Sequence, residues 1–222
     1  MKKDLTVSYM GFRLENPLIV SSSDLTATPE NIQKCEKAGA SAVVLKSLFE
    51  EQILGSTEDR SKENAMYQWY PEANDYINSQ TGRNVLNNYL KLVERAKKQV
   101  NIPVIASVNC LSSSEWLDFA KKIEDAGADG LELNIAIFPF SDEVSGSGID
   151  QQYIEIVHRI KTRINIPLAV KLGHYFSNIA QITRRLDNTG VDSLVLFNRF
   201  YRPDIDVEKM EGNEGDTVEL KD

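Results

Sequence analysis

Three segments of this 222-residue chain end on a polar side chain that could do chemistry. Residues 38–46 read AGASAVVLK, residues 126–134 read AGADGLELN and residues 189–198 read TGVDSLVLFN. In each segment a glycine ends a helix pattern, a short turn follows, and an apolar run stops on Lys46, Asn134 or Asn198. Such a repeat indicates one supersecondary unit used several times, which makes its polar strand ends candidate functional residues.

Other apolar runs stop in the same way. The full set of strand-end candidates is Ser21, Ser22, Ser23, Lys46, Ser107, Asn109, Asn134, Lys171 and Asn198. A lysine at the end of a buried strand is costly unless its ammonium meets an anion or an electron-rich group. A snorkelling side chain or a salt bridge to a nearby glutamate explains one such lysine equally well. Two of them, Lys46 and Lys171, favour a functional site.

The elements that must position these residues alternate between strands and helices. Short apolar runs fall at residues 18–20, 42–45, 104–108, 131–134, 168–172 and 192–197, with helix patterns between them and a hairpin over residues 5–16. Runs without polar alternation indicate a parallel sheet that is buried on both faces. A doubly wound sheet and a β/α barrel both fit. The barrel is favoured, because no strand is followed by GxGxxG and the polar residues lie one per strand end.

The predicted architecture is a TIM-type (β/α)8 barrel with about six β-α units. We expect the incomplete barrel to occupy residues 1–207, with a disordered acidic tail over residues 208–222. The long polar segment 49–83 is rich in aromatic residues and is predicted to be an ordered functional loop. Asp150 is the expected N-cap of the helix that follows strand four, and Glu132 is expected to face the helix layer or to meet a lysine.

Composition argues against several classes of partner. The formal net charge is −8 and no Lys/Arg-rich run is present, which disfavours binding to nucleic acids or to anionic membranes. No apolar stretch is long enough to span a bilayer. The two cysteines, Cys35 and Cys110, form no CxxC pair and indicate reduced thiols in the cytoplasm. We identify no metal-ligand spacing among the His, Cys, Asp and Glu residues.

Five stretches between about residues 10 and 206 together resemble one family, the class 1 dihydroorotate dehydrogenases and their relatives. They read GFRLENPLIVSSS, AGASAVVLKS, LELN, IPLAVKLGHYF and VLFNRF. The resemblance implies an FMN-dependent β/α barrel that transfers a hydride between a small planar substrate and flavin. It also implies a role in pyrimidine biosynthesis and a cytoplasmic location.

The resemblance implies a role for each strand end. The backbone of Ser21, Ser22 and Ser23 would pack against the flavin, and Lys46 would lie beside flavin and substrate. Asn134 would touch both, Asn198 would bind substrate and Asn109 would contact the flavin ring. Lys171 would lie near the N1–C2=O edge of the flavin, where a cation stabilises negative charge.

The chain departs from the family pattern in three places. The proton-transferring cysteine of the family is replaced by Ile137, which holds no exchangeable proton, so the catalytic base is unassigned. The loop after strand two contains Asn74 and Asn78 without the usual substrate motif. Strands seven and eight and their phosphate-binding glycine turns are not in the sequence, and the open sheet edges predict a homo-oligomer.

Two alternatives to the flavin enzyme follow from these observations. One is a truncated, catalytically inactive barrel with weak or no flavin binding. The other is a lyase or aldolase in which Lys46 or Lys171 forms a Schiff base with a carbonyl substrate.

Overall fold

The computed structural model describes residues 3–49, 82–110, 116–135, 137, 144–198, 204–206 and 211–213. Most of the predicted functional loop, including Asn74 and Asn78, therefore lies outside the described residues. So does the predicted tail, except for β11 (Glu211–Asn213), which pairs antiparallel with β10 (Asp204–Asp206).

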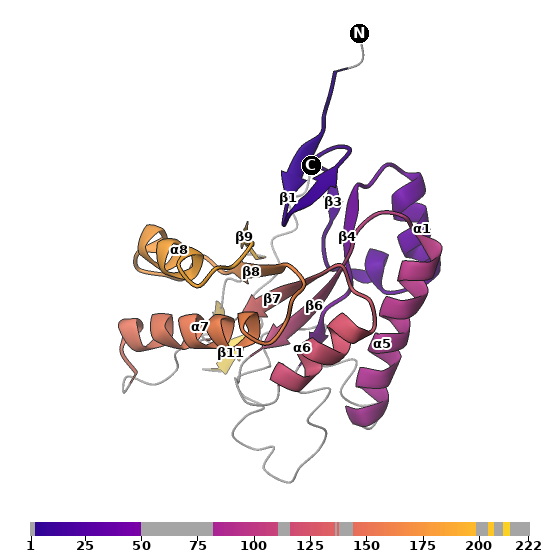
Figure 1. The fold of residues 1–222 in the computed structure, drawn as a ribbon. Coiled ribbons are helices and arrows are strands. Elements are labelled where there is room, and N and C mark those ends of the chain that lie inside the picture. The colour runs from indigo at the N-terminus through magenta and orange to yellow at the C-terminus, as the bar shows by residue number, and fades with distance from the viewer. Residues whose placement is uncertain are drawn as a thin grey trace.

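One curled parallel sheet organises the fold, and its strands pair in the order in which they occur along the chain (Figure 1). They are β3 (Ile19–Val20), β4 (Ala42–Val44), β6 (Val104–Cys110), β7 (Gly130–Ile135), β8 (Leu168–Leu172) and β9 (Ser193–Leu196). A short strand, β5 (Leu48–Phe49), pairs with β6 beyond the end of β4. Phe49 had been expected at the start of the loop 49–83.

The helices decide between the two sheet types that the sequence left open. They are α1 (Pro29–Lys37), α5 (Gly82–Gln99), α6 (Trp116–Asp125), α7 (Gly146–Lys161) and α8 (Ile179–Asp187). Each packs on the next in chain order, α1 on α5 through to α7 on α8. A doubly wound sheet reverses its strand order and carries helices on both faces. The sequential order here defines a half-barrel, which confirms the predicted fold class.

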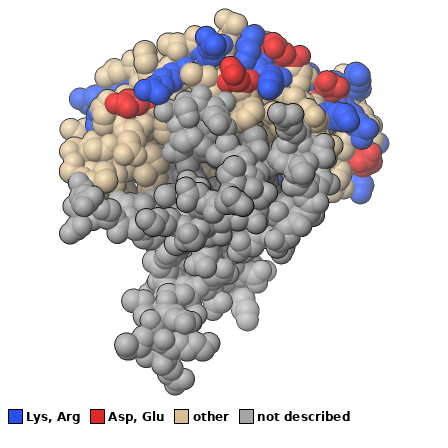
Figure 2. Space-filling model, turned by 90° about the horizontal axis from the view of Figure 1, so that it is seen from below, with Lys and Arg blue, Asp and Glu red and all other residues tan. Residues whose placement is uncertain are grey.

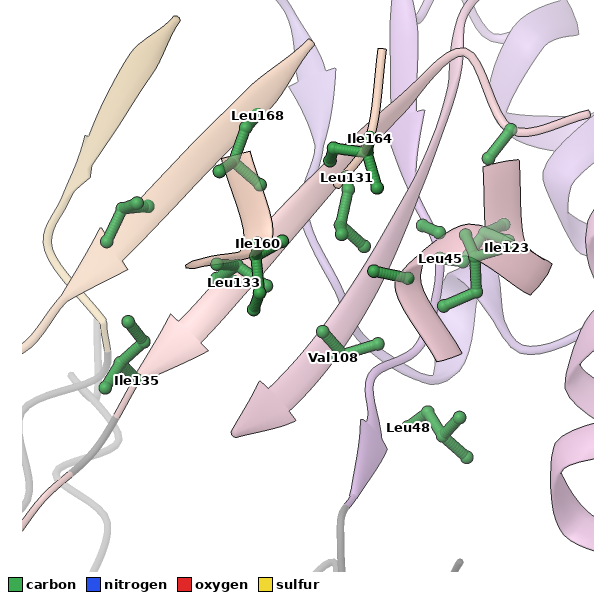
Figure 3. Packing of buried hydrophobic residues seen from close by; sticks show 14 of the residues in the cluster. Leu45, Leu48, Val108, Ile123, Leu131, Leu133, Ile135, Ile160, Ile164 and Leu168 are labelled. Atoms are coloured by element: carbon green, nitrogen blue, oxygen red, sulfur yellow. The ribbon is translucent and has the colours of Figure 1, made fainter. Parts of the chain in front are cut away.

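The larger hydrophobic core lies between the sheet and these helices. Figure 3 shows Leu131, Leu133 and Ile135 of β7 pointing from the same face of the strand, with Ile160 of α7 beside Leu133 and Ile123 of α6 farther along the same core, beside Leu45. All six side chains are almost fully buried. Since side chains alternate along a strand, the intervening residues of β7 point to the opposite, inner face.

A hairpin closes the inner face at the amino ends of the strands. It consists of β1 (Val7–Tyr9) and β2 (Phe12–Leu14). Met10 in its turn packs with Val44, Ile105 and Ala169 as a second, smaller core cluster. The inner face is therefore apolar where the turn of the hairpin packs.

The three repeated segments have the predicted geometry. Their glycines, Gly39, Gly127 and Gly190, all adopt positive φ where a helix ends. Asp129 and Asp192, each two residues later, accept hydrogen bonds from the first backbone N–H groups of the neighbouring strands, Val104 and Leu168. The repeat thus fixes where each strand starts relative to its neighbour.

Two helix starts bear on the predictions. Thr28 caps α1, with Pro29 at the first helical position. The helix start predicted at Asp150 is wrong: α7 begins at Gly146, because the Ser145 hydroxyl accepts from the backbone N–H of Gly148 and caps the helix earlier. In the described part of the chain, no helix combines the length and apolar character needed to cross a membrane.

Candidate active site at the strand ends

Three of the predicted residues form one row across neighbouring strands. Asn109 of β6 lies opposite Asn134 of β7, which lies opposite Lys171 of β8. Each is an even number of residues from an inner-face position, Asn109 from Ile105 and Lys171 from Ala169, so the row lies on the inner face. The two asparagines are 4% and 7% exposed. The parallel register thus brings two amides and one ammonium to the same level.

Asn109 has an acceptor that needs a partner. Its side-chain oxygen is buried and makes no hydrogen bond with any described residue. A buried polar atom left unpaired costs about 1–3 kcal/mol. Such an atom at the ligand end of a barrel strand is therefore suited to a donor on a bound molecule.

Asn134 and Asn198 are brought together, although they are far apart in sequence. The Nδ2 of Asn198 donates to Oδ1 of Asn134 over 3.0 Å. The backbone N–H of Asn198, two residues beyond the end of β9, donates to the carbonyl of Leu172 at the end of β8. Asn134 and Asn198, two of the three predicted substrate contacts, therefore lie at the same end of the sheet.

A second row lies one pleat below the first and contains Ser107 and Glu132. Glu132 is 3% exposed, and its Oε1 lies 3.4 Å from the Ser107 hydroxyl and 3.9 Å from Nζ of Lys171. Burial raises the pKa of the Glu132 carboxyl, against the opposing effects of Lys171 and of the Ser107 hydroxyl. Of the two orientations expected for Glu132, the structure has the pairing with a lysine and not the helix layer.

Three serines continue from Glu132 to the end of β3. The Ser107 hydroxyl lies 2.8 Å from that of Ser47, which lies 2.9 Å from that of Ser22. The backbone N–H of Ser47 also donates to the Ser22 oxygen over 2.9 Å. Ser22 is half-buried, so this line of hydroxyls connects a partly exposed strand end to a buried carboxyl.

An interruption in the sheet makes room for Ser47. On one side of β6, β4 pairs with Val104 and Ile105, whereas β5 pairs with Val108 and Asn109. The backbone of Ser107 falls in the gap. The Tyr89 hydroxyl of α5 fills it, because it accepts from the Ser107 N–H over 2.8 Å and donates to the Ser107 carbonyl over 2.9 Å.

Lys46 and the outer serines lie differently. Nζ of Lys46 pairs over 2.6 Å with Oδ1 of Asp24, in the short 3-10 helix Asp24–Thr26 that follows the serine turn. The Ser23 hydroxyl donates to the carbonyl of Ser21, which is exposed. The described contacts therefore join Lys46 to the serine turn and not to the row of Asn109, Asn134 and Lys171.

The side chain of Ile137 has no group that could transfer a proton, and the structure packs it against the large outer core. The backbone N–H of Ile137 donates to the Tyr153 hydroxyl over 3.2 Å. The same hydroxyl donates to the carbonyl of Ile135 over 3.1 Å. Burial raises the pKa of Tyr153 to about 12, so its hydroxyl keeps its proton at neutral pH.

Sequence reasoning missed three residues that shape this site. Ser47 directly follows a lysine that had already been singled out, and its position in the VLKS stretch was the available signal. Tyr89 occupies an apolar position in the helix pattern of residues 84–99, which hides the role of its hydroxyl. Asp24 gave no signal, since its partner Lys46 is distant in sequence.

Charge on the visible part of the described surface is mixed. In the view of Figure 2, basic and acidic side chains are interspersed over the described surface. Within the described ranges, no three His, Cys, Asp or Glu side chains gather in a way that could hold a metal ion. In the described contacts, the cations near the strand ends are Lys171 and Lys46. Lys171 lies beside the carboxyl group of Glu132, and Lys46 lies beside that of Asp24.

Solved structures with similar folds place the chain in the TIM-barrel fold class. A phosphonopyruvate hydrolase solved with oxalate and Mg²⁺ matches with a TM-score of 0.54 at 14% identity, covering 83% of this chain and 59% of that one. An IMP dehydrogenase/GMP reductase-like protein from Corynebacterium glutamicum matches with a TM-score of 0.51 at 17% identity, covering 86% and 47%. At these identities the likeness concerns the fold alone.

The family itself is defined by sequence. The family model for dihydroorotate dehydrogenase matches residues 4–216, and the chain belongs to this family. The catalytic subunit of dihydroorotate dehydrogenase B (NAD(+)) from Thermoplasma acidophilum is 29% identical over 210 residues, covering 92% of this chain. A putative dihydroorotate dehydrogenase A (fumarate) from Aeropyrum pernix is 26% identical over 206 residues, also covering 92%. The chain spans 65% and 64% of the lengths of these two relatives.

Proposed function

We propose that this chain is the barrel part of an FMN-dependent oxidoreductase that transfers a hydride between flavin and a small planar substrate of the dihydroorotate type. Membership of the dihydroorotate dehydrogenase family supports the reaction class. The names of the relatives support the substrate type. The cytoplasmic location and the role in pyrimidine biosynthesis, which the resemblance implies, belong to the same proposal.

The observation that carries this proposal is the buried, unpartnered oxygen of Asn109 beside Asn134 and Lys171. An isoalloxazine ring has a ring N–H that can donate to such an acceptor. It also has an edge that becomes negative on reduction, which suits a neighbouring ammonium. The residues present therefore fit FMN, which supplies the hydride-accepting ring when bound.

The proposed contacts follow the strand ends. FMN would be held by Ser21, Ser22, Ser23, Lys46, Asn109, Asn134 and Lys171, and the substrate by Lys46, Asn134 and Asn198. The hydrogen bond between Asn198 and Asn134 orients both amides before a ligand arrives. Ile137 supplies no proton acceptor, so proton transfer needs another group.

Schiff-base chemistry is disfavoured by the ion pairs. Imine formation needs a neutral lysine amine, which attacks the carbonyl. Lys46 is held by the carboxylate of Asp24, and Lys171 faces that of Glu132. Both lysines are thus engaged by carboxyl groups, which opposes their use as nucleophiles.

Titration of the purified protein with FMN tests the proposal. We expect bound flavin to appear as visible absorbance with quenched fluorescence. Asn109→Ala should weaken FMN binding about tenfold, the equivalent of about 1.4 kcal/mol for one lost hydrogen bond. Asn101→Ala is the control, because Asn101 is exposed and only its backbone N–H makes a described contact. A colourless protein that gains no absorbance with FMN would refute the proposal and favour the inactive barrel.

A further inference from the structure

One continuous line of hydrogen bonds crosses the inner face below the proposed flavin row. It passes from Ser22 to Ser47 over 2.9 Å, from Ser47 to Ser107 over 2.8 Å and from Ser107 to Glu132 over 3.4 Å. The four residues come from four different segments that meet at the strand ends. The apolar cluster of Met10, Val44, Ile105 and Ala169 lies on the same face, so the line of hydroxyls is a separate polar feature.

When Glu132 is ionised, its bonding partners determine which hydroxyl donates and which accepts along this line. A carboxylate only accepts, so Ser107 must donate to Glu132. A serine has one proton to donate, so Ser107 accepts from Ser47, which in turn accepts from Ser22. The Ser22 oxygen receives the backbone N–H of Ser47, which holds its lone pairs in place. All three hydroxyls therefore point inward, toward the carboxyl.

Glu132 is the buried end of the line. Among the described residues it is the only buried carboxyl. Lys171 of β8 and Ser107 of β6 face it, and Tyr9 of β1, which itself contacts Ser193 of β9, lies close enough to sense its charge. Burial disfavours the ionised carboxylate, and at 3.9 Å the single lysine offsets this only in part. The carboxyl is thus poised to hold a proton.

We propose that Glu132 holds a proton for the strand-end site and exchanges it with the half-buried Ser22 through the hydroxyls of Ser107 and Ser47. Its role in turnover, as the store for the proton that the substrate loses or gains, rests on the proposed function. Glu132 acts through the serines and need not touch the substrate. Glu132 and the serines thus supply the proton transfer for which Ile137 has no suitable group.

In the exchange, one O–H bond forms for each O–H bond that breaks. A proton arriving on the Ser22 oxygen displaces the Ser22 proton to Ser47, the Ser47 proton to Ser107 and the Ser107 proton to the Glu132 carboxylate. Afterwards Glu132 is neutral, and the three hydroxyls point outward. The reverse sequence returns the proton to Ser22 and restores the inward order. No electrons are transferred along the line.

Carboxyl NMR of the full chain labelled with ¹³C at the glutamate carboxyl tests the proposal without flavin. One resonance should titrate above the ordinary range of glutamate and should be lost in Glu132→Gln. Ser107→Ala keeps the carboxyl and removes a donor to its ionised form, so the same resonance should titrate at still higher pH. This second variant identifies Glu132 even if Glu132→Gln does not fold.

The route is tested by Ser47→Ala, which leaves the contact between Ser107 and Glu132 intact. We expect proton exchange to slow, so that one averaged Glu132 signal becomes two, for the protonated and ionised forms. Ser8→Ala, at an exposed position of β1, is the matched control and should leave a single signal. A Glu132 that titrates in the ordinary range, or exchange that Ser47→Ala does not slow, would overturn the proposal.

The two proposals fail separately. If FMN does not bind, the proposed function fails, whereas the NMR result still decides the proton route. If FMN binds and dihydroorotate reduces it, Glu132→Gln and Ser47→Ala should each slow reduction at least about 100-fold, the lower range for lost proton transfer. FMN affinity should change far less. Equal losses of affinity and rate would indicate a merely structural role and overturn the relay.

Discussion

Tyr89 and Tyr153 each use a buried hydroxyl to pair backbone groups of the sheet. Each buried tyrosine hydroxyl accepts one backbone N–H and donates to one backbone carbonyl at the carboxyl end of a strand. Tyr89 bridges the gap between β4 and β5, and Tyr153 holds the chain as it leaves β7. Both let the backbone depart from the sheet without leaving buried groups unpaired. The strand-end site therefore depends on hydroxyls that the helix layer contributes.

We predict that Tyr89→Phe destabilises the protein by about 1–3 kcal/mol, because it leaves the N–H and the carbonyl of Ser107 buried without a partner. Urea denaturation gives the free energy of unfolding. Tyr175→Phe is the control, since Tyr175 is 50% exposed. Equal stability of Tyr89→Phe and the parent would mean that the two backbone groups find other partners.

Glu132 makes stability depend on pH. Its pKa in the folded protein is raised above the ordinary value of 4.5, so between these two values the folded state binds more protons than the unfolded state. The free energy of unfolding therefore falls as pH rises from about 4.5 through the raised pKa. Glu132→Gln should remove this component, so its stability relative to the parent should increase as pH rises. Denaturation at several pH values measures it, with the exposed Glu94→Gln as control.

Among the elements, the β1–β2 hairpin has the clearest structural task. It covers the inner face at the end opposite the site, where Met10 and Phe12 approach the backbone at Gly130. A Cβ at Gly130 would lie 2.9 Å from the Met10 methyl and 3.3 Å from the Pro167 carbonyl oxygen. The Met10 side chain can move, but the carbonyl belongs to the backbone at the start of β8. Gly130 therefore allows close contact among hairpin, β7 and β8.

Two glycine substitutions should have opposite signs. Gly130→Ala should destabilise by about 1–3 kcal/mol through overpacking at the Pro167 carbonyl. Gly146→Ala, at the first residue of α7 where a Cβ meets nothing within 4 Å, should stabilise by about 0.4–1 kcal/mol. Thermal or urea unfolding of both variants compares them directly. Destabilisation by both would indicate that backbone strain, and not packing at the hairpin, dominates.

At the scale of the whole molecule, the half-barrel ends in two strands, β3 and β9, that each pair on one side only among the described residues. Leu196 at the end of β9 and Phe197 after it are 50% and 48% exposed, and Leu18 before β3 is 65% exposed. Exposed apolar side chains beside open strand edges are a template for pairing with another chain. The predicted homo-oligomer would form through these edges.

Sedimentation velocity should therefore detect self-association of this polypeptide that increases with concentration. Leu196→Lys should shift the distribution toward monomer, since a charge on the strand edge opposes pairing. Val144→Lys, which alters an exposed apolar residue away from the edge, is the control and should not. A sharp monomer for the parent protein at all concentrations would contradict edge pairing.

The sequence by itself determined the strands, the helix-ending glycines and the polar strand ends. Each of these is local: Gly39, Gly127 and Gly190 must adopt positive φ, and short apolar runs must be buried. Parallel strands share one carboxyl edge, so even the row of Asn109, Asn134 and Lys171 could be expected from the pattern. The start of α7 could not, because Ser145 and Asp150 are both good N-caps and only the contact with Gly148 distinguishes them.

Tertiary structure alone decided what those side chains contact. The barrel was separated from the doubly wound sheet by helix packing, which depends on the path of the whole chain. Lys46 meets Asp24 and Lys171 meets Glu132, because sheet curvature and register set distances that spacing in the sequence does not contain. The line from Ser22 to Glu132 joins residues up to 110 positions apart, and a hydrogen bond forms only where folding places the two atoms about 3 Å apart.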